Sequence, residues 1–172
     1  MAKDPYTDAF QKAMNQEIQQ LFESGWQMEG FHTQCEVSKV SMIGAFNQYV
    51  DIGIKDDDNA YSFVGIEIEH LSSYDQAREN IRKLKAWAHN SQKRQCGLLQ
   101  LFNEKCYLRE KDICLLRDFA RDNEIKGHGF YYDYAFYSIE EIPPKRLAKQ
   151  VVASKDFRTR LYQLLKYTGS CE

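Results

Sequence analysis

The sequence predicts an α/β fold: a central mixed sheet, with a β-hairpin that carries acidic residues, flanked by helices. Three observations support this prediction. Apolar residues recur with a helical period in several segments, short alternating or apolar runs lie between those segments, and an acidic turn joins two of the runs. The chain has 172 residues and no composition break, so it is expected to form a single domain over residues 1–172.

The N-terminal part of the chain is expected to form one helix and three strands. A helix is predicted over residues 7–24, where apolar residues follow a helical period and a glycine comes next. A strand with an irregular edge is predicted near residues 35–43. Residues 49–54 and 61–69 alternate between apolar and other residues on either side of the turn KDDDN. These two runs are therefore expected to pair as an antiparallel hairpin.

The register of this hairpin decides which side chains meet. Val50, Ile52 and Ile54 are predicted to share one face of the sheet because side chains alternate along a strand. A turn centred on residues 57 and 58 pairs positions whose numbers sum to about 115. That register places Glu67 within a few residues of the position opposite Asp51, on the same side of the sheet.

The C-terminal part is expected to alternate helices with strands. Helices are predicted over residues 72–90, 112–123 and 155–167, and strands over residues 96–103 and about eight residues from 129 onward. The sequence PPKR is expected to break the chain before the last helix. From about residue 141 the chain is predicted to be a basic helical extension, with seven lysines and arginines against three acids and a net charge of +4.

Composition limits the classes of function. The formal net charge is -2, so a site for a polyanion must come from local clustering of basic residues. The five cysteines have no spacing typical of a zinc site or a redox pair, which favours reduced thiols. No signal peptide or membrane-spanning segment is recognisable. The expected location is the cytoplasm, with no membrane partner, and a homodimer is left open.

Acidic residues inside apolar strands indicate a metal site. Asp51 lies in the first hairpin strand, and Glu67 and Glu69 lie in the second, in the run FVGIEIEH. Two carboxylates on one face repel each other unless a cation neutralises them, and hard oxygen ligands suit Mg²⁺ or Mn²⁺. The alternative is that these acids are ordinary exposed residues of a two-sided hairpin. Gly53 and Gly65, which leave the same face uncluttered, favour the metal site.

The pattern resembles a known family. An acid in one strand, a hairpin, a second strand of the form apolar-Glu-apolar-Glu, then a helix and a buried strand is similar to the core of the PD-(D/E)XK nuclease superfamily. The matching residues are Val50-Asp51 and Gly65-Ile66-Glu67-Ile68-Glu69, an E-x-E variant of the motif. The resemblance implies a restriction endonuclease-like fold with an αβββαβ core. It also implies a metal-dependent DNA endonuclease that hydrolyses phosphodiester bonds.

The resemblance implies specific ligands for the cation. Asp51 and Glu67 would hold Mg²⁺ or Mn²⁺, and the Ile68 carbonyl oxygen would be a further ligand. Glu36, on the strand before the first acid, is a candidate auxiliary ligand, with an ordinary surface glutamate as its alternative. Val50 replaces the proline of the motif, a change that the superfamily tolerates.

The residue at position 69 departs from the family. Most members carry a lysine where this chain has Glu69, so Glu69 decides whether the protein cuts DNA. In some members a lysine from the following helix takes over the role. Helical geometry favours Lys85 over Lys83 as this catalytic lysine, because Lys85 lies roughly 70° from the centre of the apolar stripe and Lys83 roughly 130°.

Basic residues after the hairpin are candidates for phosphate contacts. Arg78, Arg82, Lys85 and His89 lie along one stripe of the predicted helix. The residues predicted to contact DNA are Arg78, Arg82, Lys83, His89, Lys93 and Arg94. The alternative is a solvated helix face. Two other functions also stay open: a catalytically inactive nuclease-fold module that binds DNA or protein, and a structural or regulatory α/β domain.

Overall fold

The structure is a computed structural model that describes residues 4–24, 40–46, 50–56, 59, 61–70, 72–104, 108–122, 128–138 and 142–169. The helices are α1 (Pro5–Glu23), α2 (Tyr74–Asn90), α3 (Glu110–Arg121), α4 (Pro144–Ala153) and α5 (Lys155–Tyr167). The strands are β1 (Val40–Phe46), β2 (Val50–Asp56), β3 (Ser62–Glu69), β4 (Gln95–Asn103) and β5 (Gly129–Tyr137). Strands and helices alternate from β3 to α4, after the consecutive strands β1, β2 and β3, which confirms the predicted α/β class.

The strands form one mixed sheet, as predicted. Their spatial order is β1-β2-β3-β4-β5. The first two pairings are antiparallel, and β3 pairs parallel to β4 and β4 parallel to β5. The β2–β3 pair is the predicted hairpin, and the parallel pairs need the helical crossovers α2 and α3.

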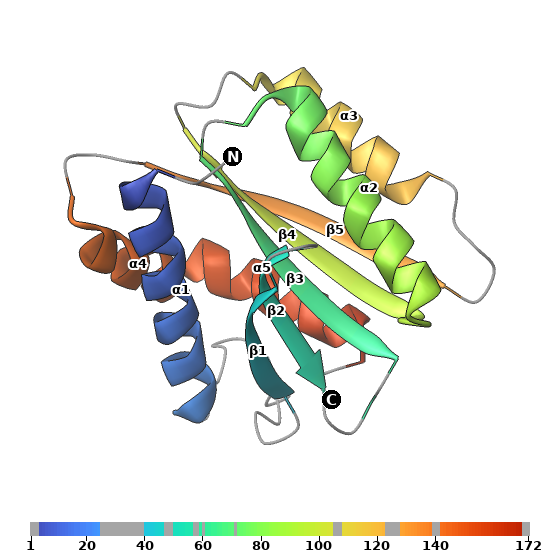
Figure 1. The fold of residues 1–172 in the computed structure, drawn as a ribbon, viewed down its shortest axis with the longest axis horizontal. Helices are drawn as coiled ribbons and strands as arrows, with labels where there is room; N and C mark the ends of the chain where they lie inside the picture. The colour runs from blue at the N-terminus through green and yellow to red at the C-terminus, as the bar shows by residue number, and fades with distance from the viewer. Residues whose placement is uncertain are drawn as a thin grey trace.

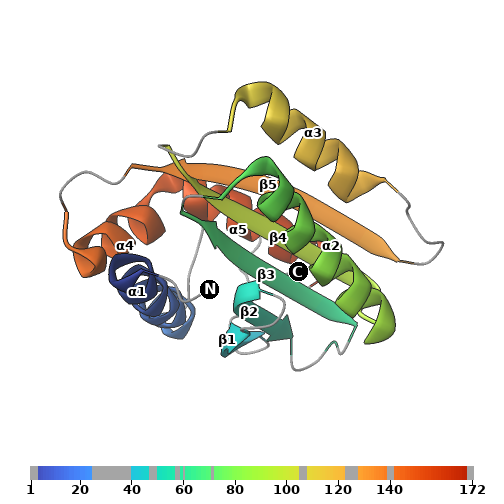
Figure 2. The same ribbon diagram turned by 45° about the horizontal axis from the view of Figure 1, so that its top comes forward.

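Helices cover both faces of this sheet (Figures 1 and 2). One core holds side chains of α1, α4 and α5 against Ile52, Ile54, Val64 and Leu101. The other core packs α2 and α3 against a second set of strand residues, including Phe63 and Leu98. Strands β3 and β4 are therefore buried on both faces. The predicted C-terminal extension is part of the first of these cores, since α5 lies against β4 and β5.

Helix α4 corrects the prediction for the C-terminal region. The dipeptide Pro143-Pro144 was expected to break the chain, but Pro144 is the first residue of a ten-residue helix. Proline is tolerated at this position because the N–H that it lacks has no helical partner there. Leu147, Ala148 and Val152 then form the buried side of α4. Among the described residues, no helix has the length and apolar character needed to cross a membrane.

The hairpin register differs from the predicted one. The pairs Ile52↔Ile66 and Gly53↔Gly65 have numbers that sum to 118 rather than 115. Ile52↔Ile66 is the last regular pair, and Asp51 and Glu67 are the next residues of the two strands. The centre of the pairing therefore falls at residue 59 rather than between residues 57 and 58, which brings Asp51 and Glu67 closer together than expected.

Val50 corrects the prediction for the hairpin faces. It was expected to share a face with Ile52 and Ile54, but it packs in the core under α2, whereas they pack in the other core. A Cβ atom added to Gly65 would lie 2.6 Å from Val50 Cγ1 and 3.4 Å from Leu84 Cδ2. Gly65 is therefore the position that lets the first residue of β2 and helix α2 approach β3.

Replacing Gly65 with alanine is expected to destabilise the fold by about 1–3 kcal/mol, the range typical of overpacking. The methyl group would overlap a β-branched side chain that has little freedom to rotate. The free energy of urea unfolding measures the effect. Val50→Ala should recover part of the loss in the double variant. A double variant whose losses are simply additive would contradict the contact.

Candidate functional site

The carboxylates of Asp51 and Glu67 each accept a backbone hydrogen bond from the opposite strand of the hairpin. The backbone N–H of Asp51 donates to Glu67 Oε2 at 3.1 Å. The N–H of Ile68 donates to Asp51 Oδ2 at 2.8 Å. Gln11 of α1 also contacts this residue, donating from Nε2 to the carbonyl oxygen of Asp51 at 3.0 Å. Each carboxylate is thus oriented by a backbone group of the other strand, where regular pairing of β2 with β3 ends.

The donor set suits a hard cation. The N–H and the C=O of one strand residue point to the same side, so the Ile68 carbonyl faces the side on which Asp51 lies. Asp51, Glu67 and this carbonyl are the predicted ligands, and the structure places them at one end of the hairpin. Within the described parts of the chain, no cluster of three or more acidic, histidine or cysteine side chains is arranged around a metal position. Mg²⁺ is commonly held by one or two carboxylates with waters completing its shell, so the residues fit this ion.

Glu69 lies in a neutral hydrogen-bond network beside this pair. Its side chain is 1% exposed. Its Oε1 atom accepts from Asn80 Nδ2 at 2.8 Å and from Gln100 Nε2 at 3.0 Å. Gln100 Nε2 also donates to the Ala77 carbonyl at 3.1 Å, and Tyr132 donates from its hydroxyl to Gln100 Oε1 at 2.6 Å. A chain of contacts therefore runs from β5 through β4 to the acid.

Burial controls the charge of this network. Loss of hydration raises the pKa of Glu69, and the nearby carboxylate of Asp51 raises it further, against hydrogen bonds from Ser72, Asn80 and Gln100 that lower it. The pKa of Tyr132 lies well above its usual value, mainly because of burial and then because of the charge on Glu69. Glu69 thus holds a proton more readily than an exposed glutamate does.

Asn80, Gln100 and Tyr132 were not predicted from the sequence. Gln100 had a usable signal, because it is a lone amide inside the apolar strand CGLLQLFN and is fully buried. A buried amide of this kind must have hydrogen-bond partners. The positions of Asn80 and Tyr132 carried no comparable signal, since both residue types are ordinary on a helix face and in a strand.

Lys85 is placed away from Glu69. Its ammonium group donates to the carbonyl oxygens of Ala120 at 2.8 Å and Asp122 at 2.6 Å, at the C-terminal end of α3. Lysine at a helix C-terminus satisfies carbonyls that lack a helical partner. Asn80, five residues earlier in α2, is the helix residue that reaches Glu69. The structure therefore does not support Lys85 as the substitute catalytic lysine.

Several of the residues predicted to contact DNA interact with separate neighbours within the protein. Arg78 lies over the Phe119 ring at 4.4 Å, and Arg94 lies over the Tyr61 ring at 4.9 Å. Arg82 donates to both carboxylate oxygens of Glu79, at 2.7 and 2.5 Å. The three others are Lys83, which is exposed, Lys93, which is half-buried, and His89, which lies against His128. Glu36 is outside the described residues.

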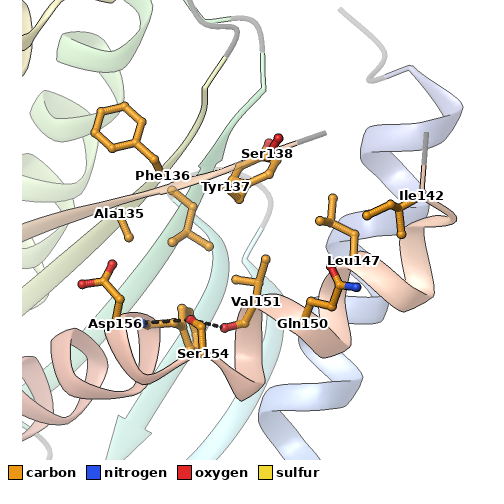
Figure 3. Close-up of a pocket in the computed structure, with 12 residues that line it drawn as sticks. Ala135, Phe136, Tyr137, Ser138, Ile142, Leu147, Gln150, Val151, Ser154 and Asp156 are labelled. Carbon is orange, nitrogen blue, oxygen red and sulfur yellow. Dashed lines mark hydrogen bonds between the residues drawn. The ribbon is translucent and has the colours of Figure 1, made fainter. Parts of the chain in front are cut away.

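A hollow of about 290 Å³ lies on the other face of the sheet (Figure 3). It is lined by the C-terminal end of β5 and by α4 and α5, with apolar side chains such as Tyr137, Leu147 and Phe157. The polar side chains in its wall include Gln150, and Asp156, which accepts from Arg160. The hollow contains none of the predicted site residues, so it does not extend the acidic site.

Comparisons of this chain with protein-family models, with curated proteins and with solved structures found no match.

Proposed function

We propose that the protein is a metal-dependent DNA nuclease with a restriction endonuclease-like fold, and that Mg²⁺ or Mn²⁺ is its cofactor. The observation that carries the proposal is the pairing of Asp51 and Glu67 across the end of the β2–β3 hairpin. The chain order α1-β1-β2-β3-α2-β4 agrees with the αβββαβ core that the sequence resemblance implies.

The residues of the site have separate roles in this proposal. Asp51 and Glu67 hold the cation together with the Ile68 carbonyl. A divalent cation in such a site lowers the pKa of a bound water and stabilises charge on the phosphate. Glu69 accepts the proton of the attacking water, because its raised pKa gives it a higher proton affinity than an exposed carboxylate has. Asn80 and Gln100 keep the Glu69 carboxylate in place.

Cleavage of supercoiled and of branched DNA, with and without MgCl₂ or MnCl₂, tests the proposal. Asp51→Asn and Glu67→Gln should each lower the cleavage rate by about 100-fold or more, since even outer contacts of metal sites contribute 10- to 100-fold. Asp118→Asn, a change at an exposed acid of α3, is the matched control and should leave the rate unchanged. Cleavage that persists in Asp51→Asn would remove the site assignment.

A second function, a catalytically inactive nuclease-fold module that binds DNA or protein, is favoured by a specific observation. Neutral donors hold Glu69, and Lys85 is engaged at the end of α3. DNA binding without cleavage, with an affinity that falls steeply with salt, would support this module over the enzyme. If the protein neither cleaves nor binds DNA, a DNA-directed role would be contradicted altogether.

A further inference from the structure

Two histidines from distant parts of the chain meet at the end of α2. His89 lies in the last turn of α2, and His128 lies directly before β5. Their ring centroids are 5.4 Å apart, and the rings are inclined at 60°. This inclination excludes parallel stacking of the two rings. The side chain of His89 is exposed, and that of His128 is half-buried, so solvent reaches the pair.

The spacing of the rings matches that of two imidazoles bound to one metal ion. A zinc–nitrogen bond of about 2.1 Å and a distance of about 1.1 Å from nitrogen to ring centre place each centroid roughly 3.2 Å from the metal. A tetrahedral angle at the metal then separates the two centroids by about 5.2 Å. In this structure the two rings already lie at about this distance, and rotation about the Cβ–Cγ bonds would aim the nitrogens.

We propose that His89 and His128 form a binding site for a divalent transition metal of the zinc, nickel and copper class, with water completing the coordination. Imidazole nitrogen suits these ions and not Mg²⁺, which prefers oxygen. The position of His89 adds to this preference, because the carbonyl end of a helix carries partial negative charge that favours a cation. A metal bound here would tie the end of α2 to the start of β5.

This site is separate from the acidic one. Glu69 lies level with Phe102 and Phe136 at the C-terminal end of the parallel strands, whereas His128 precedes their N-terminal end. His128 lies eight residues before Phe136, which corresponds to about 26 Å along the strand direction. The proposal therefore does not depend on nuclease activity, and the two sites differ in the metals that they should bind.

Calorimetric titration of the tag-free protein with ZnCl₂, NiCl₂ and MgCl₂ near neutral pH tests the proposal. The wild type is expected to bind one Zn²⁺ or Ni²⁺ with an affinity that falls at least tenfold in His89→Gln and in His128→Gln. His70→Gln removes the histidine that directly follows β3, at the opposite end of the parallel strands, and should leave that affinity unchanged, as should Asp51→Asn. Melting curves in EDTA show whether each variant is folded, and the metal should raise the Tm of the wild type but not of the two pair variants.

The outcomes that overturn the proposal are distinct. Unchanged zinc affinity in both His89→Gln and His128→Gln would exclude the pair as ligands. Loss of affinity in His70→Gln alone would place the site at the other end of the sheet. Absence of zinc and nickel binding to the wild type would also overturn it, whatever the result of the DNA cleavage assay.

Discussion

Replacing Gln100 with leucine is expected to destabilise the protein by about 3 kcal/mol or more. Leucine has a similar size but cannot donate to Glu69 Oε1 or to the Ala77 carbonyl, and it cannot accept from Tyr132. A buried polar group that loses its partner costs about 1–3 kcal/mol. Three groups lose a contact at once, and Gln100 is fully buried, so water is not at hand to replace the lost contacts.

Chemical denaturation monitored by circular dichroism measures this effect. Gln76→Leu, the same change on the exposed face of α2, is the matched control and should alter the free energy of unfolding by less than about 0.5 kcal/mol. Adding Tyr132→Phe to Gln100→Leu should recover part of the loss, because the double variant no longer contains an unpaired tyrosine hydroxyl. A loss below about 1 kcal/mol for Gln100→Leu would mean that the network contributes little to stability.

Replacing Glu69 with glutamine is expected to raise stability at neutral pH. The pKa of Glu69 is higher in the folded protein than the usual value of 4.5, so the folded state binds the proton more tightly than the unfolded state does. Wild-type stability should therefore fall as the pH rises from about 4.5 through the raised pKa, by about 1.4 kcal/mol for each unit of the shift. Glu69→Gln removes this fall, and its advantage over the wild type should vanish below pH 4.5.

Unfolding curves between pH 4 and pH 8 test this prediction. Glu79→Gln is a control in which the pH dependence has the opposite sign. The hydrogen bond and charge of Arg82 lower the pKa of Glu79, so the Glu79 side chain stabilises the folded state more at higher pH. A stability difference between the wild type and Glu69→Gln that does not change with pH would contradict the raised pKa. If Glu69→Gln abolishes DNA cleavage and also raises stability, Glu69 would contribute to activity while lowering the free energy of unfolding.

Much of the fold was predictable because it depends on local periodicity. The apolar period of α2, the alternation in YVDIGI and the apolar run of β4 each describe how one segment meets the core. The acid pair was predictable for the same reason, since carboxylates inside apolar strands are conspicuous. The prediction that missed α4 also rested on a local signal. A proline inside a helix disrupts it, but a proline at the first position can begin one. The apolar spacing of Leu147, Ala148 and Val152 favoured a helix that begins at Pro144.

What only the tertiary structure decided is how side chains of different elements meet. The hairpin register depended on where the turn is centred, and it brought Asp51 next to Glu67 at the end of the regular pairing. The side of the sheet on which Val50 packs depended on the space above Gly65. The hydrogen-bond partners of Glu69 lie on α2 and β4. Lys85 donates to carbonyl oxygens at the C-terminal end of α3, which have no partner within that helix. The sequence by itself determined which residues are chemically capable, because composition and period are local, whereas packing of distant elements determined which of them meet.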